Sequence, residues 1–169
     1  SLVSPTSFGM PRRTAIGVDH NRVSLLTAVM DKICGIHLGS SDIFLNVAGG
    51  VKVDETAIDL GIVSAMASSF LNRPIAAGTV VFGEVGLTGE IRGISQTEVR
   101  IREAARMGFA RCIMPRTLSR EILPEMPISV GDSRTFYKAI MATGMADIME
   151  TNPDHSPVCV PLPEVFHAD

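Results

Sequence analysis

Two glycine-rich stretches are the first places in this sequence where chemistry could be expected. Residues 49–52 read Gly-Gly-Val-Lys, and residues 83–90 read Gly-Glu-Val-Gly-Leu-Thr-Gly-Glu. The first stretch has a lysine but lacks both the spacing and the hydroxyl residue of a phosphate-binding P-loop. The second follows an expected strand but leads into another strand, whereas a dinucleotide-binding fingerprint opens a helix. We therefore interpret the first as a sharp turn or a close approach of the backbone, and the second as a tight turn.

Metal and disulfide chemistry find little support in the spacing of the side chains that would carry them. The histidines show no i, i+4 pairing, and the cysteines are odd in number and far apart, so neither a zinc motif nor a disulfide framework can be drawn. These residues are His20, His37, His155, His167, Cys34, Cys112 and Cys159. We expect no metal site and no cofactor in this chain.

Composition indicates a globular protein with an uneven charge distribution. The 169 residues are 46% hydrophobic and 20% charged, which suits one domain with a substantial core. No apolar run approaches the roughly 20 residues of a membrane span, and no signal peptide is visible, so a soluble cytoplasmic protein is expected. Residues 1–140 carry a formal charge of +2 and residues 141–169 one of −5. Such a weak basic excess does not by itself indicate nucleic-acid binding.

Hydrophobic periodicity and capping residues predict alternating strands and helices. Asp19 can cap a helix over residues 22–33 that ends at Gly35, and a nearly all-apolar pattern predicts a central helix over 56–71. Ser95 and Glu98 are spaced as a capping box for a helix that reaches Met107. The remaining expected elements are strands over 13–19, 42–47, 51–53, 80–85, 89–93, 110–114 and 128–131, and a helix over 133–143. This order predicts an α+β fold around one mixed sheet with packed helices.

Three segments together carry a family resemblance. They are VAGGVKVDETA at 47–57, VFGEVGLTGEIR at 81–92 and EAARMGF at 103–109. Combined, they resemble the C-terminal domain of RadA/Sms DNA-repair proteins over about residues 2–145. That family is similar in turn to the proteolytic domain of Lon, so the resemblance implies the Lon-protease-like, ribosomal protein S5 domain 2-like fold.

Composition and the resemblance together predict a domain organisation. Residues 1–11 would be a linker from a missing N-terminal ATPase region, residues 12–145 the Lon-like domain, and residues 146–169 an acidic, proline-containing mobile tail. The family resemblance assigns ATP, Mg and Zn to the missing N-terminal regions and not to this domain.

The comparison with Lon bears on catalysis because Lon cleaves peptides with a serine nucleophile and a lysine. An ungapped alignment places Ala57 at the serine position and Glu98 at the lysine position. Thr56 is the nearest hydroxyl, but it is one residue out of register, about 100° around the helix. We therefore expect this domain to be a pseudo-protease, with no catalytic residues and no enzymatic activity. The full-length protein would be a DNA-dependent ATPase.

What remains is a function carried by surfaces. The resemblance implies a hexameric ring that drives branch migration, in which this domain supports assembly and contacts DNA without reading its sequence. Lys52 and Arg92, on or beside glycine-rich turns, are the preferred phosphate contacts. The other candidates are Arg12, Arg13, Arg22, Arg100, Arg102 and Arg106. Expected partners are further copies of the chain, single-stranded or branched DNA, and the recombinase RecA, with no membrane.

Two alternative functions remain open. One is a pure oligomerisation or partner-docking domain that never touches DNA, and the more remote one is an active Lon-type serine peptidase that uses shifted residues. For each basic candidate, an ordinary solvated charge or a salt bridge is as good an interpretation as a DNA contact.

Overall fold

The computed structural model describes residues 1–7, 9–115 and 129–132, the last four by their backbone only. Its elements in chain order are β1 (Leu2–Pro5), β2 (Arg13–Ile16), α1 (His20–Cys34), β3 (Ser41–Asn46), the 3-10 helix η1 (Thr56–Ile58), α2 (Asp59–Phe70), β4 (Thr79–Val81), β5 (Glu84–Val85), β6 (Ile91–Arg92), α3 (Thr97–Arg106), β7 (Arg111–Met114) and β8 (Ser129–Asp132). The expected helix over 133–143, the tail and Cys159 lie outside the described residues. No described helix is long and apolar enough to cross a membrane.

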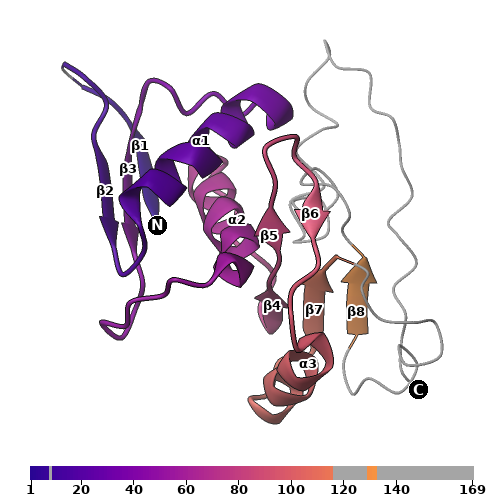
Figure 1. The fold of residues 1–169 in the computed structure, drawn as a ribbon. Coiled ribbons are helices and arrows are strands. Elements are labelled where there is room, and N and C mark those ends of the chain that lie inside the picture. The colour runs from indigo at the N-terminus through magenta and orange to yellow at the C-terminus, as the bar shows by residue number, and fades with distance from the viewer. Residues whose placement is uncertain (8, 116–128, 133–169) are drawn as a thin grey trace.

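The strands of this part of the chain form three small sheets, so the expectation of one sheet is wrong (Figure 1). The first sheet has the order β1-β3-β2, the second β4-β7-β8, and the third is the hairpin β5-β6. In the first sheet β3 pairs parallel with β2 and antiparallel with β1, so the connection through α1 makes one β-α-β unit. The coarse prediction of a mixed α+β fold is confirmed.

The segment predicted as one strand over 80–85 divides between two sheets. β4 pairs parallel with β7, whereas β5 pairs antiparallel with β6. The break falls at Gly83, whose N–H donates to the carbonyl of Ala57 and whose carbonyl accepts from Leu60 N–H. A Cβ at Gly83 would lie 2.7 Å from the Ile91 side chain. The backbone of Gly83 is therefore hydrogen-bonded to η1 and to the first turn of α2 instead of to a neighbouring strand.

Strand β1 lies within the stretch that the sequence analysis treats as a linker. Leu2 pairs with Phe44 and Pro5 with Ser41, and the N–H of Val3 also donates to the Ser69 hydroxyl at 2.9 Å. The linker prediction did not anticipate this strand, because residues 2–5 show no alternation that distinguishes them from loop. The expected domain boundaries themselves stay a prediction.

Helix α1 begins and ends as its capping residues predict. The Asp19 carboxylate accepts from Arg22 N–H at 2.9 Å, and Gly35 at φ 64° donates its N–H to the carbonyl of Met30. Both contacts satisfy backbone groups that a helix end leaves unpaired. The helix packs on β2 and α2, and Arg22 in its first turn contacts Asp59 at the start of α2.

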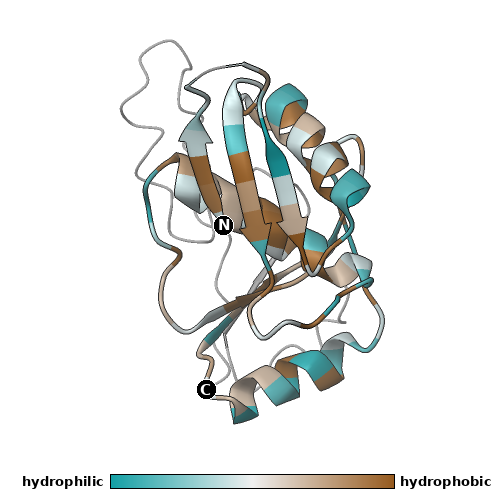
Figure 2. Cartoon of the chain, turned by 90° about the vertical axis from the view of Figure 1, so that its left-hand side faces the viewer, coloured by the Kyte–Doolittle hydropathy of each residue, from teal (hydrophilic) through white to brown (hydrophobic). Residues whose placement is uncertain are grey.

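Helix α3 begins differently from the prediction. Gln96 is the N-cap residue at φ 56° and makes no side-chain capping bond, so the expected Ser95–Glu98 capping box is not formed. Glu98 instead pairs with Arg102 at 3.0 Å, one turn along the helix. At the bottom of Figure 2, α3 alternates between hydrophilic and hydrophobic residues, as expected of a surface helix with one buried face.

Two apolar clusters hold these elements together. The larger joins α1, α2, the first sheet and the hairpin, and its fully buried side chains include Leu26, Met30, Leu60 and Met66. The smaller lies under α3 and is made of Phe82, Ile101, Ala104, Cys112 and Met114. Burial of the two thiols Cys34 and Cys112 raises their pKa to about 12, as expected for inert cysteines.

Candidate functional site

An ion pair between the half-buried Arg22 and the fully buried Asp59 joins the first turns of α1 and α2. The Arg22 guanidinium donates to both carboxylate oxygens of Asp59, from Nε at 2.8 Å and also from Nη2. Asp59 is fully buried, and its carboxylate also accepts from Val85 N–H at 3.1 Å. The hydrogen bonds to Asp59 raise the pKa of Arg22 above its usual value. This pair therefore links α1, α2 and the β5-β6 hairpin.

A cavity of about 190 Å³ lies beside this ion pair. Its lining is part apolar and part acidic: Val18, Asp19, Arg22, Val53, Asp54, Glu55, Thr56, Ile58, Asp59 and Ile62. Asp19, Asp54 and Glu55 are exposed, whereas Val18 and Ile62 are buried. The cavity thus has an apolar wall and carboxylates toward solvent.

A second cluster of charges surrounds the β5-β6 turn. Arg92 pairs with Glu90 at 2.6 Å and with Glu84 at 3.4 Å, and Glu84 also accepts from the Thr56 hydroxyl at 2.9 Å. Hydrogen bonds from Thr88, assisted by Arg92, lower the pKa of Glu90 to about 2. The predicted tight turn is confirmed, since Gly86 N–H donates to the carbonyl of Glu90 at 2.9 Å.

Among the predicted DNA contacts, Lys52 and Arg92 are both exposed but differ in their surroundings. The Lys52 side chain is 73% exposed and its ammonium lies 3.1 Å from the equally exposed Asp54 carboxylate. Arg92 is 57% exposed and lies between two carboxylates. The positive φ angles of Gly49 and Gly50, 88° and 69°, confirm the sharp turn before Lys52.

The arginines of α3 also have carboxylate partners. Arg100 pairs with Glu55 and donates from Nε to the Ser95 carbonyl at 3.1 Å. Arg102 pairs with Glu98, and Arg106 pairs with Glu103 at 3.2 Å. Arg102 and Arg106 are exposed and Arg100 is half-buried.

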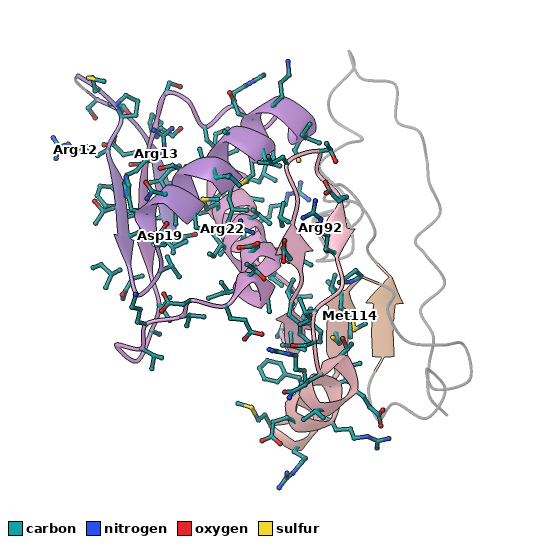
Figure 3. The ribbon with its side chains drawn as sticks, viewed as in Figure 1. Arg12, Arg13, Asp19, Arg22, Arg92 and Met114 are labelled. Atoms are coloured by element: carbon teal, nitrogen blue, oxygen red, sulfur yellow. The ribbon has the colours of Figure 1, made fainter. Side chains whose placement is uncertain are left out.

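Arg12 and Arg13 lie at the β2 end of the molecule, well away from Arg92 (Figure 3). The backbone N–H of Arg12 donates to Asp42 at 2.9 Å and lowers the pKa of that carboxyl. The Arg13 Nε atom is buried without a hydrogen-bond partner among the described residues. The basic residues predicted to contact DNA therefore do not form one patch.

Ala57 and Glu98, the two positions aligned with the Lon dyad, lie in different elements and in different surroundings. Ala57 is buried in η1, and its carbonyl accepts from Gly83 N–H. Glu98 lies in the first turn of α3, paired with Arg102. Thr56 is exposed and donates to Glu84. Within the described residues, no group of three or more His, Cys, Asp or Glu side chains could hold a metal ion.

Sequence reasoning missed Asp59 and Glu84, although Asp59 left a visible signal. It is a lone carboxylate inside the long apolar pattern of the central helix, and a charge in such a place is rarely buried without a partner. Its partner Arg22 is 37 residues away, so the pairing itself could not be inferred locally.

Comparison with known proteins decides the family. The family model described as subunit ChlI of Mg-chelatase matches residues 6–117. The chain is 56% identical over 115 residues to the DNA repair protein RadA of Halalkalibacterium halodurans, and 57% identical over 115 residues to that of Bacillus subtilis. The chain belongs to the ChlI family and is a RadA-related domain. Each alignment covers 68% of the chain and 25% of the relative.

The RadA of Streptococcus pyogenes is 51% identical over 116 residues, which are 69% of the chain and 26% of that relative. The RadA-related domain thus spans about a quarter of the length of the curated relatives that it matches. The resemblance seen in the three sequence segments is confirmed.

The same findings contradict the prediction that this domain has no enzymatic activity. The matched family model describes a subunit of an enzyme, Mg-chelatase, and the matched residues include nearly all of the described chain. The prediction rested on Ala57 and Glu98, which concern only Lon-type peptide cleavage. The absence of that one dyad does not exclude other activities, so the prediction was wrong.

Proposed function

We propose that this RadA-related domain has the Lon-protease-like, ribosomal protein S5 domain 2-like fold and serves DNA repair by supporting a hexameric ring and contacting DNA without sequence preference. The observation that carries the proposal is the identity of 51–57% to curated DNA repair proteins named RadA. Branch migration, ATP with Mg and Zn in other parts of such a protein, RecA as a partner and a cytoplasmic location belong to the same proposal.

The exposure of Lys52 supports a contact with phosphates. Its ion pair with Asp54 joins two side chains that are 73% and 70% exposed. Exposed pairs of this kind contribute only about 0–1 kcal/mol, so a phosphate can replace Asp54 at little cost. Backbone contact of this type is independent of base sequence.

Arg92 is the second proposed phosphate contact, and its surroundings make binding less favourable in free energy than at Lys52. It would have to turn from Glu90 and Glu84 toward a phosphate, and both carboxylates would repel the incoming anion. The hydrogen bond with Glu90 raises the pKa of Arg92, so the guanidinium is charged at any working pH. We expect Arg92 to contribute less than Lys52.

We expect a single copy of the domain to bind DNA weakly, because its basic residues are scattered over the surface. Arg12 and Arg13 lie far from Arg92, and most other candidates are paired with carboxylates. A ring would repeat each contact and multiply the total, since linked sites bind at a high effective concentration.

The proposal is tested by fluorescence anisotropy with labelled single-stranded DNA. The double variant Lys52→Ala with Arg92→Ala should bind about fivefold or more weakly than the wild type, because two charge contacts are lost. Lys32→Ala, an exposed base in the last turn of α1, is the matched control and should bind like the wild type. Equal binding by the double variant would show that these two assignments are wrong.

Assembly is tested separately by sedimentation velocity over a range of concentrations. Oligomers up to six copies are expected, and DNA should shift the distribution toward them. A domain that assembles but shows no DNA binding would favour the alternative of a pure oligomerisation or partner-docking domain.

A further inference from the structure

The cavity beside Arg22 combines features that suit a basic side chain. Its volume of about 190 Å³ is below the roughly 300–1,000 Å³ of typical small-molecule pockets, so it has room for one side chain and not for a nucleotide. Val18, Val53, Ile58 and Ile62 give it an aliphatic wall. Such a wall can pack against the methylene stem of a lysine or arginine.

The charged groups of the cavity fall into two sets. Asp59 is fully buried and already holds Arg22 and Val85 N–H, so it has little capacity left for a ligand. Asp19, Asp54 and Glu55 are exposed. With Asp59 included, four carboxylates face the three cations Arg22, Lys52 and Arg100, so the surroundings of the cavity carry a net charge of −1 and favour a cation over a phosphate.

Two of these carboxylates have competing cations nearby. Asp54 faces Lys52, and Glu55 faces Arg100. The Lys52 pair joins two largely exposed side chains and can open at little cost in free energy. Asp19 uses one oxygen to accept from Arg22 N–H at the start of α1. An incoming guanidinium can thus be held between Asp19 and Asp54 without displacing Arg22 from Asp59.

We propose that this cavity is a docking site for an arginine or lysine side chain of a partner polypeptide. The stem of that side chain packs against the four aliphatic residues, and its charged head lies among the exposed carboxylates. The proposal does not depend on DNA contact, although the cavity shares Asp54 with the ion pair of Lys52, the proposed phosphate contact.

The experiment uses the peptide acetyl-Gly-Arg-Gly-amide and, as a neutral analogue of nearly the same shape, the peptide with citrulline in place of arginine. Amide shifts of the labelled chain are followed by NMR during each titration. The arginine peptide should bind about fivefold or more tightly than the citrulline peptide and should shift the amides of Val53, Thr56 and Ile58. Equal affinities, or shifts confined to other regions, would overturn the proposal.

Variants locate the site. Asp19→Asn keeps a capping oxygen but removes the charge, so Asp19→Asn combined with Asp54→Asn should weaken arginine-peptide binding about fivefold with the fold intact. Asp31→Asn, near the other end of α1, is the matched control and should have no effect. Binding that survives the double variant unchanged would refute the assignment, and thermal melts confirm that each variant is folded.

Lys52→Ala separates this proposal from DNA binding. Removing the competitor of Asp54 should strengthen arginine-peptide binding about twofold, while the same change weakens DNA binding. If Lys52→Ala weakened peptide binding, the docking proposal would fail whatever the DNA result. If peptide binding strengthened and DNA binding stayed unchanged, only the DNA proposal would fail.

Discussion

The ion pair between the half-buried Arg22 and the fully buried Asp59 leads to a specific stability prediction. Replacing Arg22 with Met keeps most of the side-chain volume but leaves the Asp59 carboxylate, which is 0% exposed, with Val85 N–H as its remaining hydrogen-bond donor among the contacts described. An uncompensated buried charge of this kind typically costs about 3–5 kcal/mol of stability. We therefore expect Arg22→Met to lower the free energy of unfolding by about that amount.

Urea unfolding followed by far-UV circular dichroism measures the effect. Arg102→Met is the matched control, because Arg102 is paired with Glu98 one turn away on the surface of α3. An i, i+4 surface pair contributes about 0.3–0.5 kcal/mol, so this change should be nearly neutral. Adding Asp59→Leu to Arg22→Met should recover much of the loss, since the buried charge is then removed. If Arg22→Met cost no more than Arg102→Met, the account of this ion pair would be wrong.

Two further predictions concern acid stability and a backbone contact. Glu90 has a folded pKa of about 2 against an ordinary 4.5, so its stabilising effect is complete above about pH 4.5 and is lost as the pH falls toward 2. Glu90→Gln should flatten the fall in stability over that window, measured by urea unfolding at successive pH values; an unchanged profile would contradict the assigned shift. Gly17 has φ 82° and an added Cβ would lie 2.7 Å from a backbone carbonyl oxygen, whereas Gly49 has φ 88° with nothing within 4 Å. Gly17→Ala should cost about 1–3 kcal/mol and clearly more than Gly49→Ala, and thermal melts showing equal costs would refute the close approach.

The helices could be predicted because their signals are local. Asp19 and Gly35 mark the two ends of α1 within a few residues, and the apolar pattern marks α2 directly. The start of α3 escaped prediction because Gln96 adopts a left-handed conformation that a glutamine seldom takes, and this displaced the expected cap.

The sheets could not be divided correctly from the sequence. β4 pairs with β7, about 30 residues later, and nothing in the stretch 80–85 shows that its two halves belong to different sheets. Strand β1 was missed for the same reason, since its partner β3 lies about 40 residues away. Strand pairing depends on residues far apart in the sequence, whereas the ends of a helix depend on residues within about one turn.

In the candidate site, too, local features could be predicted from the sequence and long-range contacts could not. The basic residues could be identified in the sequence, but their ion-pair partners could not. The pairs of Arg100 with Glu55 and of Arg22 with Asp59 illustrate this. These contacts change the ranking of the candidates. Arg22 is committed to a buried carboxylate, whereas Lys52 lies exposed beside one that it can leave.

DNA contact by this RadA-related domain is tested most directly by filter-binding titration with single-stranded DNA at a series of salt concentrations. Contact with phosphates predicts that the logarithm of the binding constant falls linearly with the logarithm of salt, by about 0.7 for each contact. The variant Lys52→Ala with Arg92→Ala should reduce the slope by about 1.4 for each copy bound. A slope near zero for the wild type, or the same slope for both proteins, would contradict the account.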